Sequence, residues 1–415
     1  MASASIGSIF GTTPRAARAA ATPAVNVRDP RLDFYRGIAM IIILFAHTPG
    51  NFFTSWIPAR WGFSDATEIF VFCSGMASAI AFGRTFERAG WTLGSLRVGY
   101  RVWQVYWAHI AMFFTIAMLM AVLNETQLGP RNYIGQLNLW KFFAEPAPQL
   151  IGLFTLTYVP NYFDILPMYL VILAMMPVMI ALGRTSPYLA FAAMAALWVL
   201  AQSALWEWLG APDVALNFPA EPWSEREWFF NPFGWQLIFF TGFAFMIGWL
   251  RPPPVSWWLI GLAALIVLVN IPLSNIGVRE LELEWAREWR LENRSWFSKS
   301  DFGILRYIQF LALAYLFWVA AGAHGARLKP EGRDIASRTW GGVVRIIMKI
   351  GQQSLAVFVF SMVFARLIGF TLDVIGRDTW KVVAMNLVGV AALIAVAYLV
   401  AWVKSTPWKP KAKPA

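Results

Sequence analysis

The sequence predicts an all-α fold, namely a polytopic membrane protein with about ten transmembrane helices and both termini in the cytoplasm. Of its 415 residues, 58% are hydrophobic and only 14% are charged. A soluble domain of this length does not sustain such a composition together with a positive mean hydropathy. The apolar residues form runs that could cross a bilayer, and Lys and Arg gather in alternate connections between these runs.

Apolar runs of about 17 to 25 residues give the predicted spans. The 23 Trp and 11 Tyr residues favour the same interpretation, because their rings are enriched at membrane interfaces. A further apolar stretch, residues 149–159, is too short to cross and is interpreted as a re-entrant or surface segment on the outer side. The spans centre on residues 34–50, 66–83, 98–123, 162–182, 187–209, 233–250, 255–272, 302–322, 346–371 and 380–403.

The basic residues orient the chain in the membrane. Lys and Arg accumulate in cytoplasmic connections, so their bias predicts a cytoplasmic N-terminus in a multi-pass protein of the bacterial inner (plasma) membrane. The same bias accounts for the net charge of +11, and we therefore expect membrane lipid, and no nucleic acid, as a partner. Two of the basic connections carry Arg84, Arg88, Arg97 and Arg101, and Arg327, Lys329, Arg333 and Arg338.

Composition also predicts the domain organisation. Residues 1–27 are rich in Ala, Thr and Ser and hold no apolar core long enough for a signal sequence, so they are predicted to form a disordered cytoplasmic tail. Residues 28–403 form the predicted transmembrane domain, and residues 404–415 form a basic cytoplasmic tail. Cys73 is the one cysteine, which leaves no disulfide framework within the chain and is interpreted as a buried small hydrophobe.

The first predicted helix carries Arg36 and His47 with ten residues between them. This spacing is close to three full helical turns, so the two side chains share a face and lie roughly 16 Å apart along the axis. Ionisable residues inside a span are functional candidates, and the stripe links the cytoplasmic interface to a histidine in the outer half. The alternative is that Arg36 marks the cytoplasmic side and His47 is an interfacial histidine.

The second predicted helix opens with two carboxylates, Asp65 and Glu68, on one face. A carboxylate in this position could orient the imidazole of His47. Asp65 could instead be an N-cap of the helix. Glu68 is predicted to lie too far into the span for capping and is favoured as the functional acid.

Other polar residues inside spans are further candidates. Arg97 and Arg101, at i and i+4, could bind phosphate groups; the competing explanation is a basic connection beside a span. His109 falls near the midplane and is either a packed or a catalytic histidine. No His and Cys spacing suits zinc, so no metal is expected. A polar cup on the outer side is predicted from Asp164, Asn231, Trp235, Gln236, Lys299 and Arg306.

These residues lie in a pattern that resembles the OpgC-type membrane proteins, within the wider acyltransferase type 3 group. The hallmark of that group is an Arg and a His separated by ten residues on the first helix. The resemblance runs from about residue 28 to 365 and is specific because its blocks occur in order. Besides the Arg36 and His47 pair, the blocks are RDPRLDFYRG (28–37), GFSDATEIFVFCSG (62–75), RVWQVYWAH (101–109), DILPMY (164–169), FNPFGWQ (230–236), and KSDFGILR (299–306) with FLALAY (310–315).

The resemblance implies transfer of an acyl group, succinyl in the namesake, from coenzyme A to hydroxyls of periplasmic osmoregulated glucans. It implies that His47 is the catalytic base, that Arg36 belongs to the donor site and that Glu68 assists. Coenzyme A carries several phosphates, so a cationic inner mouth is expected; Arg36, Arg97 and Arg101 would form it, with Lys349 as a fourth candidate. The expected partners are therefore acyl-CoA as co-substrate and a periplasmic saccharide acceptor.

A transporter or flippase is the main alternative, in which Arg36, His47 and Glu68 would line a translocation path. Many transporters contain internal repeats, and no repeat is evident in this sequence. The sequence therefore favours an enzyme, and it leaves the acyl chain, the acceptor and the formation of a homo-oligomer open.

Overall fold

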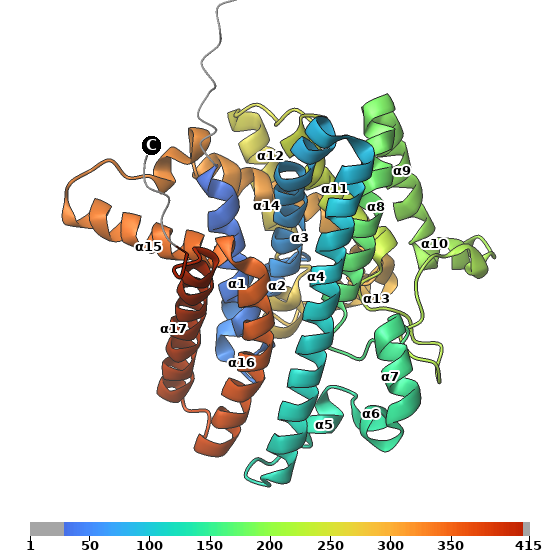
Figure 1. Ribbon diagram of the computed structural model, residues 1–415, viewed down its shortest axis with the longest axis vertical. Helices are drawn as coiled ribbons and strands as arrows, with labels where there is room; N and C mark the ends of the chain where they lie inside the picture. Colours follow the sequence, from blue (N-terminus) through green and yellow to red (C-terminus); the bar gives the residue numbers. More distant parts are fainter. Residues whose placement is uncertain (1–28, 410–415) are drawn as a thin grey trace, which may run out of the picture.

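The fold is a bundle of helices. The computed structural model describes residues 29–409, and Figure 1 shows most of its longer helices packed side by side. Within these residues the only β feature is an isolated bridge between Pro219 and Glu227. The all-α prediction is therefore confirmed for residues 29–409. The predicted tail over residues 1–27 and the last six residues of the basic C-terminal tail lie outside this range.

Four helical stretches in the described range are long and apolar enough to cross a membrane. They are Ala66–Glu125, Ile165–Thr185 (α8), Ser354–Ile375 (α16) and Thr379–Lys404 (α17). These stretches fit a membrane protein, while the number of ten spans and the side of each terminus stay predictions.

The remaining helices either follow predicted spans or connect them. Helix α1 (Pro30–His47) and the shorter apolar helices α9, α11, α12 and α14 fall on predicted spans. The stretch predicted to be too short to cross is the ten-residue helix α7, which lies beside α4 and accepts a hydrogen bond from Tyr106 Oη at the carbonyl of Phe154. The bounds are α2 Pro58–Trp61, α5 Tyr133–Gln136, α6 Trp140–Ala144, α7 Pro146–Thr155, α9 Pro187–Leu200, α10 Ser203–Trp208, α11 Pro232–Ile247, α12 Trp257–Asn270, α13 Glu284–Glu292 and α14 Ile304–Ala320.

The stretch Ala66–Glu125 is a hairpin rather than one straight helix. It consists of α3 (Ala66–Ser78), a π-helical turn and α4 (Arg84–Glu125). Gly90 breaks α4 with a φ of 79°, a conformation that glycine adopts at little cost. The chain reverses there and its two sides meet, as the close approach of Gly94 to Phe86 shows: a Cβ on Gly94 would lie 2.6 Å from the Phe86 ring. The separate spans predicted at 66–83 and 98–123 correspond to the two arms.

The span predicted over residues 346–371 is wrong in its boundaries. The structure ends α15 (Ile335–Gln352) and begins α16 at Ser354, with Gln353 in a non-helical conformation between them. Figure 1 shows α15 running across the bundle, whereas α16 runs along it. The last turns of α15 are apolar, so hydropathy alone could not separate them from α16, because an apolar run gives no information on a change of chain direction.

Close backbone contacts position α1 and α3. A Cβ on Gly75 of α3 would lie 1.9 Å from the carbonyl oxygen of Phe239 in α11, and one on Gly37 of α1 would lie 2.0 Å from that of Ile347 in α15. Small residues allow membrane helices to approach this closely. Helix α1, which carries Arg36 and His47, and α3, which carries Glu68, are therefore tightly packed against their neighbours.

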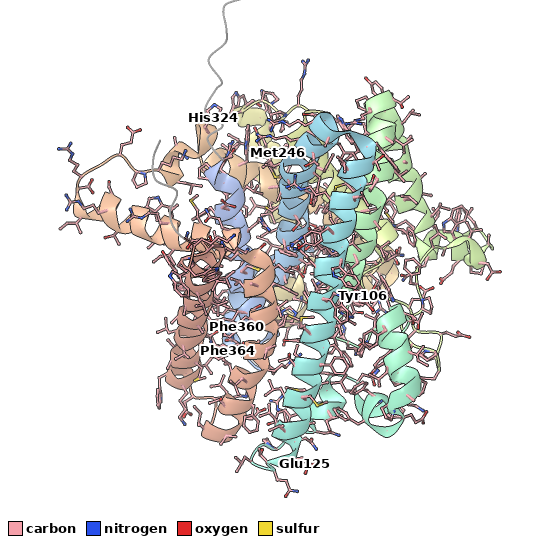
Figure 2. All side chains as sticks on the ribbon, viewed as in Figure 1. Tyr106, Glu125, Met246, His324, Phe360 and Phe364 are labelled. Atoms are coloured by element: carbon pink, nitrogen blue, oxygen red, sulfur yellow. The ribbon has the colours of Figure 1, made fainter. Side chains whose placement is uncertain are left out.

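The site residues of α1 lie toward two opposite ends of the bundle. Figure 2 labels His324 and Met246 at one end and Glu125 at the other. Helix α1 begins near His324, since Gly325 contacts Pro30. We call this the basic end, and we call the region where α1 finishes the His47 end.

Candidate functional site

His47 is the last residue of α1, and a backbone carbonyl fixes its ring. Its Nδ1 lies 2.8 Å from the carbonyl oxygen of Ile43. A carbonyl oxygen only accepts hydrogen bonds, so in the neutral ring Nδ1 carries the proton. The Nε2 atom is then left with a lone pair, as a general base requires.

Two residues that the sequence analysis did not select lie beside His47. The ring of Tyr162 meets the imidazole edge to face, with centroids 5.2 Å apart. The guanidinium carbon of Arg366, from α16, lies 3.9 Å from the centroid of the same Tyr162 ring. Arg366 falls inside a predicted span, so the rule that ionisable residues in spans are functional candidates would have found it. Tyr162 carried no comparable signal.

Asp65 and Glu68 form the N-terminal cap of α3. The Asp65 side chain accepts a hydrogen bond from the Thr67 amide at 2.6 Å, and Glu68 Oε2 accepts one from the Asp65 amide at 2.7 Å. The N-cap alternative for Asp65 is confirmed, and the expectation that Glu68 lies too deep to cap is wrong. The reason is that the side chain of the third helical residue reaches back to the N-cap amide in a capping box.

The same two carboxylates also belong to a charge cluster. Glu68 is fully buried and pairs with Arg306 at 2.7 Å, while Asp65 pairs with Lys299 at 2.5 Å. Burial favours the protonated form of Asp65, but the attraction of Lys299 and Arg306 outweighs it and holds the pKa of Asp65 well below its usual range. Within residues 29–409, the described contacts of Glu68 join it to this cluster and the helix cap and not to His47.

A polar cavity of about 210 Å³ adjoins the charge cluster. Lys299 and Arg306, both predicted on the acceptor side, line it together with Asp65. Arg290 and Asn275, which the sequence analysis did not select, line it as well. The stacked rings of Phe63 and Phe297, 4.9 Å apart, form its apolar wall. Three cations and one carboxylate give this cavity a positive balance.

The other four residues predicted for the acceptor side hold loops and helices together. Asn231 donates to the carbonyl of Leu216 at 2.7 Å, and Trp235 Nε1 donates to that of Lys299 at 2.8 Å. Gln236 donates to the carbonyl of Met194 at 2.8 Å, which joins α11 to α9. Asp164 accepts from the amide of Phe229 at 3.3 Å, and burial raises the pKa of Asp164 to about 6. All four are buried, and among them only the Trp235 contact reaches a residue that lines the cavity.

At the basic end, two of the four predicted donor-site cations share one region. Arg36 donates to the hydroxyl of Ser354, at the start of α16. The neighbouring Gln353 accepts from Lys404 at 2.7 Å, and Lys404 lies within electrostatic range of Arg101. Lys404, which was predicted to belong to the C-terminal tail, thus lies near Arg101 and also contacts the residue next to Ser354, the partner of Arg36.

The other two cations face different neighbours. Arg97 donates to the hydroxyl of Thr85 across the break at Gly90 in α4, and its guanidinium lies 5.7 Å from the Phe82 ring. Lys349 lies 5.8 Å from the ring of Tyr398.

His109 is fully buried in α4. Neither of its ring nitrogens makes a hydrogen bond with any residue of the described range. The packing interpretation of His109 is favoured by this burial, because a group that acts on a substrate needs a route to it. In the same range no cluster of three or more His, Cys, Asp or Glu residues could hold a metal ion.

Comparison with known proteins identifies one family. The family model described as OpgC protein matches residues 28–405, which is nearly the whole chain. No curated protein and no solved structure matches. The match covers both α1 and the charge cluster, so it includes the candidate site.

Proposed function

The chain belongs to the OpgC protein family, and on this premise we propose that it is a membrane O-acyltransferase. In this proposal, a cytoplasmic acyl-CoA gives its acyl group, succinyl in the first instance, to a hydroxyl of a periplasmic glucan or another saccharide. His47 is the general base. The observation that carries the proposal is the orientation of His47, whose Nδ1 bonds to the Ile43 carbonyl and leaves Nε2 as an acceptor.

The chemistry needs a base because a hydroxyl has a pKa far above neutrality. His47 Nε2 would take the proton as the hydroxyl oxygen attacks the thioester carbonyl. In this proposal Glu68 does not touch the imidazole; it holds Arg306 and the start of α3 in position. Glu68 is therefore a positioning residue, in contrast to the carboxylate partner inferred from the sequence.

The donor would bind at the basic end. Arg36, Arg101 and Lys404 supply positive charge for the phosphates of coenzyme A, and phosphate binding by such side chains is strong when the groups are partly desolvated. The stripe from Arg36 to His47 spans roughly 16 Å along α1, a distance that the pantetheine arm of an extended acyl-CoA could cover. Arg97 and Lys349 have only a secondary part in this proposal, because they face Thr85 and Tyr398.

The acceptor would enter from the His47 end. The cavity lined by Asp65, Lys299 and Arg306 offers hydrogen-bonding groups, and the Phe63 and Phe297 rings offer an apolar face for a sugar ring. Asp65 and Lys299 also lie within electrostatic range of His47, so the cavity adjoins the proposed reaction centre.

The test is a transfer assay with purified protein, succinyl-CoA labelled in the acyl group and a β-glucan oligosaccharide. The parent protein should move label to the oligosaccharide, and His47→Ala should not. A transporter or flippase would bind and move substrate without forming an ester. Release of intact glucan across a vesicle membrane with no ester formed would therefore support that alternative and overturn the enzyme.

A further inference from the structure

Tyr162 has a strained backbone next to His47. Its φ is 89°, which is rare for a bulky residue. The surrounding contacts hold it there: Tyr162 Oη donates to the carbonyl of Met362 at 2.7 Å, and Arg226 donates to Asn161 and to the carbonyl of Val159 on the preceding residues. Strain that several contacts maintain is typical of functional sites.

A cationic side chain packs on the ring of Tyr162. Arg366 lies on the face of the Tyr162 ring with its guanidinium carbon 3.9 Å from the ring centroid. The same ring contacts the His47 imidazole, so His47 and Arg366 share one neighbour and interact electrostatically. The Nε–H of Arg366 is buried and makes no hydrogen bond within residues 29–409. A buried donor without an acceptor is costly unless an acceptor arrives during function.

We propose that Arg366, seated on the ring of Tyr162 beside His47, is a further catalytic residue that stabilises the oxyanion formed during acyl transfer; this inference rests on the function proposed above. Within residues 29–409 Arg366 forms no ion pair with a carboxylate, whereas Lys299 and Arg306 pair with Asp65 and Glu68. Preorganised donors of this kind supply much of the rate enhancement in acyl transfer.

Acyl transfer begins with attack on the thioester and ends with release of coenzyme A. His47 Nε2 takes the proton of the acceptor hydroxyl while its oxygen forms a bond to the thioester carbon. The π electrons of the carbonyl move to its oxygen, and this oxyanion accepts a hydrogen bond from Arg366. When the oxyanion collapses, the C–S bond breaks, and the departing coenzyme A thiolate takes the proton from the His47 imidazolium. The products are the ester and free coenzyme A.

The test compares Arg366→Gln with a matched control, Arg287→Gln, in the labelled transfer assay. The Arg287 side chain is 65% exposed, so the same change there should leave transfer at the parental rate. Arg366→Gln should lower kcat by about 100-fold to 1,000-fold, the usual effect of losing one oxyanion donor, with little change in the Kd of succinyl-CoA. A merely structural role would lower binding and the yield of folded protein together.

Arg366→Lys and two Tyr162 variants sharpen the result. The Lys variant keeps the charge, so its kcat should lie between those of the parent and Arg366→Gln, and a Lys variant no faster than the Gln variant would contradict the proposal. If the Gln variant does not fold, the test rests on Arg366→Lys, and a parental kcat in that variant would overturn the role of Arg366 in stabilising the oxyanion. Tyr162→Phe keeps the ring and should retain more kcat than Tyr162→Leu; equal losses would also contradict it.

The outcomes separate this inference from the function on which it rests. If the parent transfers acyl groups and His47→Ala does not, but Arg366→Gln keeps the parental kcat, only the role of Arg366 fails. If the parent itself forms no ester, the acyltransferase proposal fails as well.

Discussion

His47 and Arg36, near the two ends of α1, are held by different kinds of contact. At the His47 end, the His47 ring bonds to the carbonyl of Ile43, and Arg377 donates to the carbonyl of Pro49 at 2.5 Å. Asn51 and Asn386 exchange a reciprocal pair of buried hydrogen bonds just beyond. At the basic end Arg36 contacts the Ser354 side chain, and the exposed Lys404 contacts Gln353. Backbone partners cannot rotate away, whereas side-chain partners can.

This difference fits the two tasks in the proposed function. Proton transfer requires a base held within a few tenths of an ångström, which backbone contacts provide. Binding a flexible, multiply charged donor tolerates cations that adjust to it. We therefore expect substitutions at the His47 end to change the rate of transfer, and substitutions at the basic end to change donor binding.

The largest effect is expected at His47. His47→Ala should lower the rate of transfer by about 100-fold to 10,000-fold, because the positioned base is lost. The Kd of acyl-CoA should stay near that of the parent, since the imidazole lies roughly three turns from Arg36. Single-turnover transfer and equilibrium binding of labelled succinyl-CoA measure the two quantities. Transfer at the parental rate would contradict the role of His47 as the general base.

The buried ion pair should have the next largest effect, on stability. Arg306→Gln leaves the fully buried Glu68 carboxyl without its ion partner, and breaking such a pair costs about 3 to 5 kcal/mol. Thermal unfolding in detergent should therefore begin at a clearly lower temperature. The double variant Arg306→Gln with Glu68→Gln removes both charges and should recover part of the loss. A double variant that is no more stable than Arg306→Gln would show that the pair is not coupled.

A smaller effect is expected at the basic end. Arg36→Gln should weaken acyl-CoA binding by about 10-fold or more, from roughly 1.5 to 3 kcal/mol for a hydrogen bond to a charged group. Lys404→Gln should weaken it as well, with transfer at saturating donor unchanged. Isothermal titration in detergent measures the Kd. Unchanged Kd in both variants would move the donor site away from this end.

The smallest effect is expected at Arg97. Its guanidinium donates to Thr85 and lies over the Phe82 ring, so it holds together the two sides of the break at Gly90. Arg97→Gln should change the Kd of acyl-CoA by less than about 2-fold, within the range of a surface substitution. The same titration applies. A loss of acyl-CoA affinity as large as that of Arg36→Gln would place Arg97 in the donor site together with Arg101.

The sequence by itself determined the all-α fold class and predicted the main candidate site residues. Long apolar runs in a bilayer must form helices, because their backbone groups have no water to bond with. The helical period likewise put Arg36 and His47 on one face of α1, and the family blocks predicted the membership that the family model confirms. The apolar runs, the helical period and the family blocks are all read along the chain, so these predictions needed no tertiary information.

Only the tertiary structure decided which side chains meet. The pairing of Glu68 with Arg306, the contact of Tyr162 with His47 and the bridge from Lys404 to Gln353 each join residues far apart in the sequence. Hydropathy and helical period carry no record of such contacts, and neither recorded the bend at Gln353 between α15 and α16. The partner of each charge depends on how helices pack, because a buried charge must be paired where the fold brings an opposite one.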